Sequence, residues 1–91
     1  MFDKSIAIVD VNPKLLSTYS DALKMSGYYN ISSFTDPLLA YKQIQENPHK
    51  YSLLIIDDKM PNTDGLYLST KLLEINPKLN VILLNKKEFQ L

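Results

Sequence analysis

The pattern of apolar positions divides the chain into short apolar runs and longer segments with helical spacing. Residues 5–9, 52–57 and 81–84 are almost uninterrupted runs of aliphatic residues, which is typical of strands buried on both faces. Residues 28–34 carry fewer apolar side chains, among them Ile31 and Phe34, and predict a strand at the edge of a sheet. Four strands are therefore expected.

Between these runs, apolar residues recur three or four positions apart and predict three helices. Two helices are expected to start at cap-and-proline pairs, Asn12-Pro13 and Asp36-Pro37, and the third at Asp64 or Gly65. Their expected ends are Gly27, Asn47-Pro48 and Asn76-Pro77. The apolar residues assigned to the third helix are Leu66, Leu68, Leu72, Leu73 and Ile75.

Strands and helices alternate along the chain, which predicts an α/β fold. Right-handed crossovers in such a chain give a parallel sheet with helices on both faces. The pattern leaves the order of the strands open. Order 2-1-3-4 is the arrangement that brings Asp10 and Asp57, at the ends of the first and third strands, within reach of one ligand.

Composition limits which partners and which cellular compartment are expected for the protein. Ten lysines balance ten acidic residues, and the isoelectric point is near 6.5, so a basic surface for nucleic acid is not expected. The chain lacks cysteine, which permits a reducing compartment. The apolar run at residues 6–9 is too short for a signal peptide, and no segment is long enough to span a membrane. We expect a cytoplasmic protein of one domain.

Asp57 is the candidate reactive residue, because it ends a buried strand just before turn residues. A carboxylate that accepts a phosphoryl group needs a hard cation such as Mg²⁺, which is held by carboxylates from more than one strand end. Asp10 and Asp57 fit that requirement. The alternative is that Asp57, Asp58 and Asp64 are turn and cap residues, and composition alone does not separate the two interpretations.

Several motifs together resemble the receiver domain of two-component response regulators. They are Val9-Asp10, Asn12-Pro13, Phe34-Thr35-Asp36, Ile56-Asp57-Asp58-Lys59-Met60-Pro61, Asp64-Gly65 and Val81-Ile82-Leu83-Leu84. The resemblance implies a flavodoxin-like fold, with Asp57 as the phosphoacceptor. It also implies that Asp10, Asp57 and the backbone carbonyl of Lys59 bind Mg²⁺, and that the partner is a sensor histidine kinase or a phosphotransfer protein.

The chain departs from the family pattern at several positions. Val11 stands where the family has a second acid, so weak Mg²⁺ binding is expected. Asn85 occupies the switch position of a Thr or Ser. The family's fourth helix, fifth strand and fifth helix have no counterpart in residues 1–91, and the lysine that neutralises the phosphoryl group is missing with them. Lys86 or Lys59 is a possible substitute for that charge.

The fourth strand is expected to lie at the edge of the sheet in order 2-1-3-4. It consists of Val81, Ile82, Leu83 and Leu84, and an apolar edge must be protected or paired. We therefore expect a homodimer in which two fourth strands pair antiparallel across a two-fold axis. If the chain is a cut fragment, aggregation is expected instead.

Three functions are compatible with the sequence. The first is a receiver domain in phosphorelay signalling that accepts a phosphoryl group on Asp57. The second is a degenerate receiver that acts as a phosphorylation-independent dimerisation or protein-interaction module, as Val11 and Asn85 suggest. The third, a hydrolase with Asp57 as nucleophile, needs a general acid two residues later, where Lys59 stands. We therefore expect no enzymatic activity.

Overall fold

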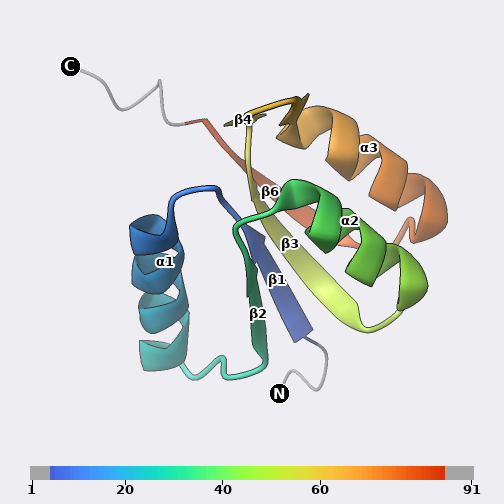
Figure 1. Ribbon diagram of the computed structural model, residues 1–91. Coiled ribbons are helices and arrows are strands. Elements are labelled where there is room, and N and C mark those ends of the chain that lie inside the picture. Colours follow the sequence, from blue (N-terminus) through green and yellow to red (C-terminus); the bar gives the residue numbers. More distant parts are fainter. Residues whose placement is uncertain (1–4, 86–91) are drawn as a thin grey trace.

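The computed structural model describes residues 5–85, which form a four-stranded parallel sheet (Figure 1). The strands are β1 (Ser5–Val9), β2 (Ile31–Phe34), β3 (Tyr51–Asp57) and β6 (Asn80–Leu84). Their order is β2-β1-β3-β6, and every neighbouring pair is parallel. This confirms the predicted flavodoxin-like arrangement 2-1-3-4, and β2 and β6 are the edges of the sheet formed by residues 5–85.

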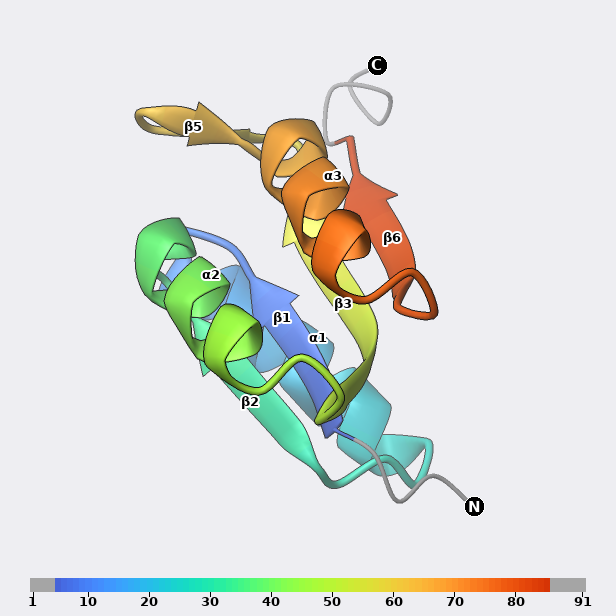
Figure 2. The ribbon, with the colours of Figure 1, turned by 90° about the vertical axis from the view of Figure 1, so that its right-hand side faces the viewer.

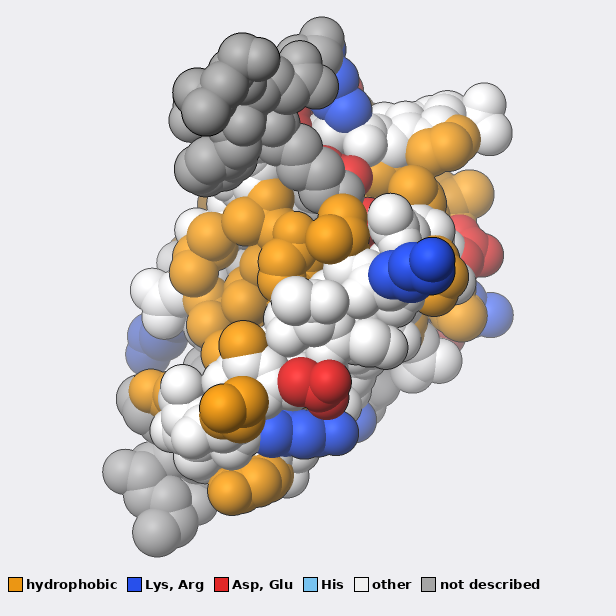
Figure 3. Space-filling model, turned by 90° about the vertical axis from the view of Figure 1, so that its left-hand side faces the viewer, with side chains coloured by type: hydrophobic (Ala, Val, Ile, Leu, Met, Phe, Trp, Pro, Cys, Tyr) orange, Lys and Arg blue, Asp and Glu red, His pale blue; other side chains and the backbone are white. Residues whose placement is uncertain are grey.

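Helices lie on both faces of the sheet, as the crossovers require. One face carries α1 (Pro13–Met25), and the other carries α2 (Pro37–Glu46) and α3 (Gly65–Ile75) (Figures 1 and 2). Between the sheet and the α2–α3 layer lies the larger core, which includes Val9, Ala40, Ile44, Leu54, Ile56, Leu68 and Leu72. Under α1 lies a smaller core of Ile6, Ile8 and Leu16. Figure 3 looks at the α1 side and shows apolar side chains gathered at its surface.

Two helices begin at the predicted caps. The Asn12 side chain accepts hydrogen bonds from the backbone N–H groups of Lys14 and Leu15, at 2.9 and 3.4 Å. Asp36 does the same for the backbone N–H groups of Leu38 and Leu39. These bonds satisfy donors that have no partner within the helix. Helix α2 ends at Glu46, just before the predicted stop at Asn47-Pro48.

Gly27 lies two residues after the end of α1 and terminates this helix, as predicted. It adopts φ of +94°, and its N–H donates to the Lys24 carbonyl while the Tyr28 N–H donates to the Leu23 carbonyl. This pair of bonds defines a Schellman motif, which favours glycine because other residues are strained at positive φ.

A short hairpin follows β3 and was not predicted. Strands β4 (Lys59–Met60) and β5 (Thr63–Asp64) pair antiparallel, and Asn62 takes φ of +66° in the turn between them. The sequence predicted an acidic loop here, because Pro61 and Asn62 signal a turn while two-residue strands give no periodic pattern. The side chain of Asp64 caps α3 by accepting from the Tyr67 N–H, which confirms its interpretation as a cap residue.

Within residues 5–85, no helix combines the length and the hydropathy that a membrane span requires.

Candidate functional site

The carboxyl ends of β1 and β3 lie side by side and present Asp10 and Asp57. Val9 pairs with Ile56 in the parallel register, so Asp10 and Asp57 follow at neighbouring positions of adjacent strands. Adjacent strands are about 4.8 Å apart. Asp10 is fully buried, and Asp57 is 5% exposed. The structure therefore brings together the two acids that the sequence singled out.

Backbone contacts hold Asp10 at this position. Its N–H donates to the Phe34 carbonyl of β2 at 3.0 Å. Its Oδ1 atom accepts from the Asn12 N–H at 2.9 Å. Asn12 therefore caps α1 with its side chain and orients the Asp10 carboxylate with its backbone N–H. The start of the helix thus also positions a residue of the site.

Asp58 connects the end of β3 to two other elements through its backbone. Its N–H donates to the Leu84 carbonyl of β6 at 2.9 Å, and its carbonyl accepts from the Gly65 N–H at 2.7 Å. These bonds fix β6 and the start of α3 against the strand that carries Asp57. The backbone of Asp58 therefore has a structural role next to Asp57.

Gly65 is a site residue whose role sequence reasoning missed. A Cβ built at Gly65 would lie 2.9 Å from Cδ1 of Leu83 and 3.0 Å from the carbonyl carbon of Asp57, and closer still to that carbonyl oxygen. Only glycine allows α3 to start this close to the end of β3. The Asp64-Gly65 pair signalled a turn, but its packing against Asp57 depends on the tertiary structure.

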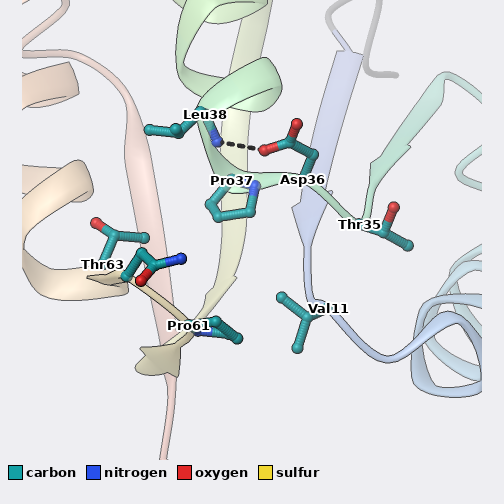
Figure 4. A pocket seen from close by; sticks show the side chains of 8 residues that line it. Val11, Thr35, Asp36, Pro37, Leu38, Pro61 and Thr63 are labelled. Carbon is teal, nitrogen blue, oxygen red and sulfur yellow. Dashed lines mark hydrogen bonds between the residues drawn. The ribbon is translucent and has the colours of Figure 1, made fainter.

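A hollow of about 280 Å³ lies between the β1–α1 loop, the start of α2 and the β4–β5 hairpin (Figure 4). Its lining residues are Val11, Thr35, Asp36, Pro37, Leu38, Pro61, Asn62 and Thr63. Val11 and Pro61 both border this hollow. The exposed fraction of Val11 is 38%. Val11, which the resemblance places at the position of a second acid, thus presents an isopropyl group to this hollow.

Few side chains at the carboxyl ends of the strands could bind a metal ion. Among residues 5–85, no three His, Cys, Asp or Glu side chains form a group that could hold a metal ion. The predicted ligands that the structure brings together are the carboxylates of Asp10 and Asp57. Lys59 directly follows Asp58, begins the hairpin and is exposed. In the antiparallel register of the hairpin it lies opposite Asp64. One or two carboxylates suit a hard cation such as Mg²⁺ that retains several waters.

The predicted switch and charge positions lie after β6. Asp57 pairs with Leu84 in the register, so Asn85 follows at the same end of the sheet and is half-buried. Lys86, the possible charge substitute, lies outside the described residues.

A four-stranded parallel sheet with this order, two acids at its switch point and helices on both faces defines a receiver-like α/β domain. The model of the response regulator receiver domain matches residues 6–89, and the chain belongs to this family. The response regulator receiver protein CpdR of Brucella abortus is 38% identical over 61 residues. That match covers 67% of this chain and 48% of CpdR, so the chain spans about half the length of this curated relative.

Solved structures share the fold. The receiver domain of the hybrid histidine kinase CckA is 26% identical, with a TM-score of 0.81, and the match covers 93% of this chain and 78% of that one. A response regulator protein from Burkholderia pseudomallei is 23% identical, with a TM-score of 0.78, over 92% of this chain and 48% of that one. The latter structure holds a phosphorylated aspartic acid and a calcium ion.

The family assignment confirms the resemblance that the motifs suggested. The chain is a receiver domain of two-component response regulators, a class of signalling module.

Proposed function

We propose that Asp57 is the phosphoacceptor of this receiver domain. The observation that supports this most directly is the position of Asp57, at the carboxyl end of β3 and one strand away from the buried Asp10. The structure of the response regulator protein from Burkholderia pseudomallei holds a phosphorylated aspartic acid, which supports this proposal. The donor is a phosphohistidine on a sensor histidine kinase or a phosphotransfer protein.

In the transfer, a carboxylate oxygen of Asp57 attacks the phosphorus. The new O–P bond forms as the P–N bond to the histidine breaks, and the imidazole nitrogen keeps the electron pair and takes up a proton. Asp57 is the last residue of β3, so the donor approaches the carboxyl end of the sheet.

Magnesium, if bound at this site, would neutralise negative charge during the transfer. Asp10, Asp57 and the backbone carbonyl of Lys59 are the residues that would hold it. Val11 adds no oxygen, so affinity in the unphosphorylated state is low. The Asn12 N–H keeps the Asp10 carboxylate in place for this role.

Beryllofluoride, a mimic of the phosphoryl group, tests the proposal. We expect amide NMR shifts around residues 57–59 when it is added with Mg²⁺, and no such shifts in Asp57→Asn. Asp58→Asn is the matched control, because it removes the neighbouring carboxylate and keeps the backbone bonds of Asp58. Removal of Mg²⁺ with EDTA should abolish the response.

A phosphorylation-independent interaction module is the second candidate function. The observation that favours it is the apolar Val11 side chain at the hollow beside the site. Unchanged spectra up to tens of millimolar Mg²⁺ with beryllofluoride would support this function and refute the first.

We also propose that the domain forms a homodimer through β6. This strand is an edge of the described sheet, and Ile82 and Leu83 are 48% and 37% exposed. Antiparallel pairing of two copies would satisfy the outward backbone groups of both edges. Size-exclusion chromatography with light scattering should give a dimer at tens of micromolar, which Leu83→Lys dissociates and Leu66→Lys, on exposed α3 surface, does not. A monomeric native chain refutes this proposal.

A further inference from the structure

The hollow beside the candidate site has a largely apolar lining. Its apolar residues are Val11 from the β1–α1 loop, Pro37 and Leu38 from the start of α2, and Pro61 from the β4–β5 hairpin. Figure 4 shows Val11, Pro37 and Pro61 converging on this space from three elements. Val11 is 38% exposed and Leu38 is 65% exposed, so apolar surface around the hollow faces solvent. Apolar surface of this kind is typical of a site that binds a partner.

The hollow is unsuited to a phosphate or another anion. Asp36 is the only ionisable residue among the described residues that line it, and this residue is acidic. Its Oδ1 atom accepts from the backbone N–H groups of Leu38 and Leu39 at 2.9 and 3.4 Å, so these donors at the start of α2 already have a partner. The lining therefore favours an uncharged, apolar group.

The volume of the hollow fits a large side chain. It measures about 280 Å³, whereas a cavity of about 150 Å³ in the core of another protein binds a benzene molecule. A leucine or phenylalanine side chain of a partner therefore fits into it.

The hollow lies within the area that a protein phosphodonor must cover. Val11 directly follows Asp10, which is one strand away from Asp57, so strands about 4.8 Å apart place the hollow about 10 Å from Asp57. A transient interface buries about 600 Å² on each partner, and a circle of that area reaches about 14 Å from its centre. A protein whose phosphohistidine reaches Asp57 therefore covers the hollow, whereas a small phosphodonor does not.

We propose that this hollow receives an apolar side chain of the protein that phosphorylates Asp57, and that Leu38 and Val11 thereby help to select the donor. The proposal rests on the function of Asp57 as phosphoacceptor, because only that transfer brings the donor over the hollow. A side chain anchored in a pocket of an interface supplies much of the binding free energy. An acid in place of Val11 would have to lose its hydration on contact with such a side chain, whereas the isopropyl group does not.

Two phosphodonors of different size test the proposal. The histidine kinases of the source organism, each autophosphorylated with ATP, are the protein donors, and phosphoramidate is the small donor. Phosphate-affinity gel electrophoresis measures the phosphorylated fraction of the chain, with Asp57→Asn as the background. We expect the native chain to accept the phosphoryl group from phosphoramidate and from at least one kinase.

Leu38→Gln removes apolar surface from the hollow and keeps the charge of the chain and the backbone bond to Asp36. With the kinase as donor, it should raise KM at least about tenfold and leave the rate at saturation unchanged, because it buries an amide in an apolar contact. The rate with phosphoramidate should stay unchanged. Leu39→Gln is the matched control, because this neighbouring side chain is 47% exposed and does not belong to the lining. Leu38→Met should keep most of the native affinity.

Circular dichroism checks that each variant is folded. Equal effects of Leu38→Gln and Leu39→Gln on transfer from the kinase overturn the proposal. A matching loss with phosphoramidate overturns it as well, because Leu38 would then act on Asp57 rather than on the bound donor. Transfer to the native chain from phosphoramidate but from no kinase refutes the docking proposal alone. Transfer from neither donor refutes the phosphoacceptor role of Asp57 on which the docking proposal rests.

Discussion

Replacing Gly65 with alanine adds one methyl group at the junction of β3, α3 and β6. That carbon would lie 2.9 Å from Cδ1 of Leu83 and 3.0 Å from the carbonyl carbon of Asp57, whereas ordinary contacts begin near 3.4 Å. The Leu83 side chain can rotate away. The Asp57 carbonyl cannot, because it belongs to the backbone of a central strand. The helix must therefore move away from the residue proposed to carry the phosphoryl group.

The cost follows from two opposing contributions. Alanine favours the helix and restricts the unfolded chain, which together stabilise the protein by at most about 1 kcal/mol. Overpacking against backbone costs about 1–3 kcal/mol or more, and displacement of α3 also weakens the 2.7 Å bond from the Gly65 N–H to the Asp58 carbonyl. We expect a net loss of about 2–3 kcal/mol, which lowers the melting temperature by about 10–20 °C in a domain of this size.

Urea unfolding followed by circular dichroism measures this loss directly. Leu66→Ala is the matched control, since it changes the next residue of the same helical turn, which is 61% exposed, and should cost less than about 0.5 kcal/mol. A loss below about 1 kcal/mol for Gly65→Ala would refute the close contact between α3 and the end of β3.

Three further substitutions test other parts of the structure. Val11→Asp adds a carboxylate beside Asp10 and should tighten Mg²⁺ binding about tenfold by calorimetric titration; unchanged affinity would show that this loop does not face the cation. Asp36→Ala removes the two cap bonds of α2 and should cost about 1 kcal/mol in urea unfolding, with Asp36→Asn restoring most of it. Asn76→Ala removes the 2.7 Å bond to the Pro48 carbonyl and should cost about 1–3 kcal/mol of unfolding free energy, and a neutral result would show that this bond is not formed in solution.

Much of the fold could be predicted because its signals are local. Asn12-Pro13 and Asp36-Pro37 mark helix starts through bonds to N–H groups two and three residues away. The apolar runs mark buried strands because a parallel sheet covered on both faces excludes water from both sides of a strand. The acids of the candidate site were found by the same means, since each directly follows or ends such a run.

The position of apolar residues on the helices was less predictable. Leu66 and Leu68 were assigned to the same apolar set, yet Leu68 is buried and Leu66 is 61% exposed. Apolar spacing identifies a helix, but it does not say how wide a stripe its neighbours cover. The β4–β5 hairpin was missed for a related reason, because two-residue strands are too short to show a period.

The sequence by itself determined the three helices, the four strands of the parallel sheet and their succession along the chain, and it singled out Asp10 and Asp57 as the candidate site. Caps, apolar runs and motifs depend on residues close together in the chain. The tertiary structure decided the close approach at Gly65 and the position of Val11 at a hollow. These features join residues that are distant in the sequence. They exist only once strand register and helix packing bring those residues into contact.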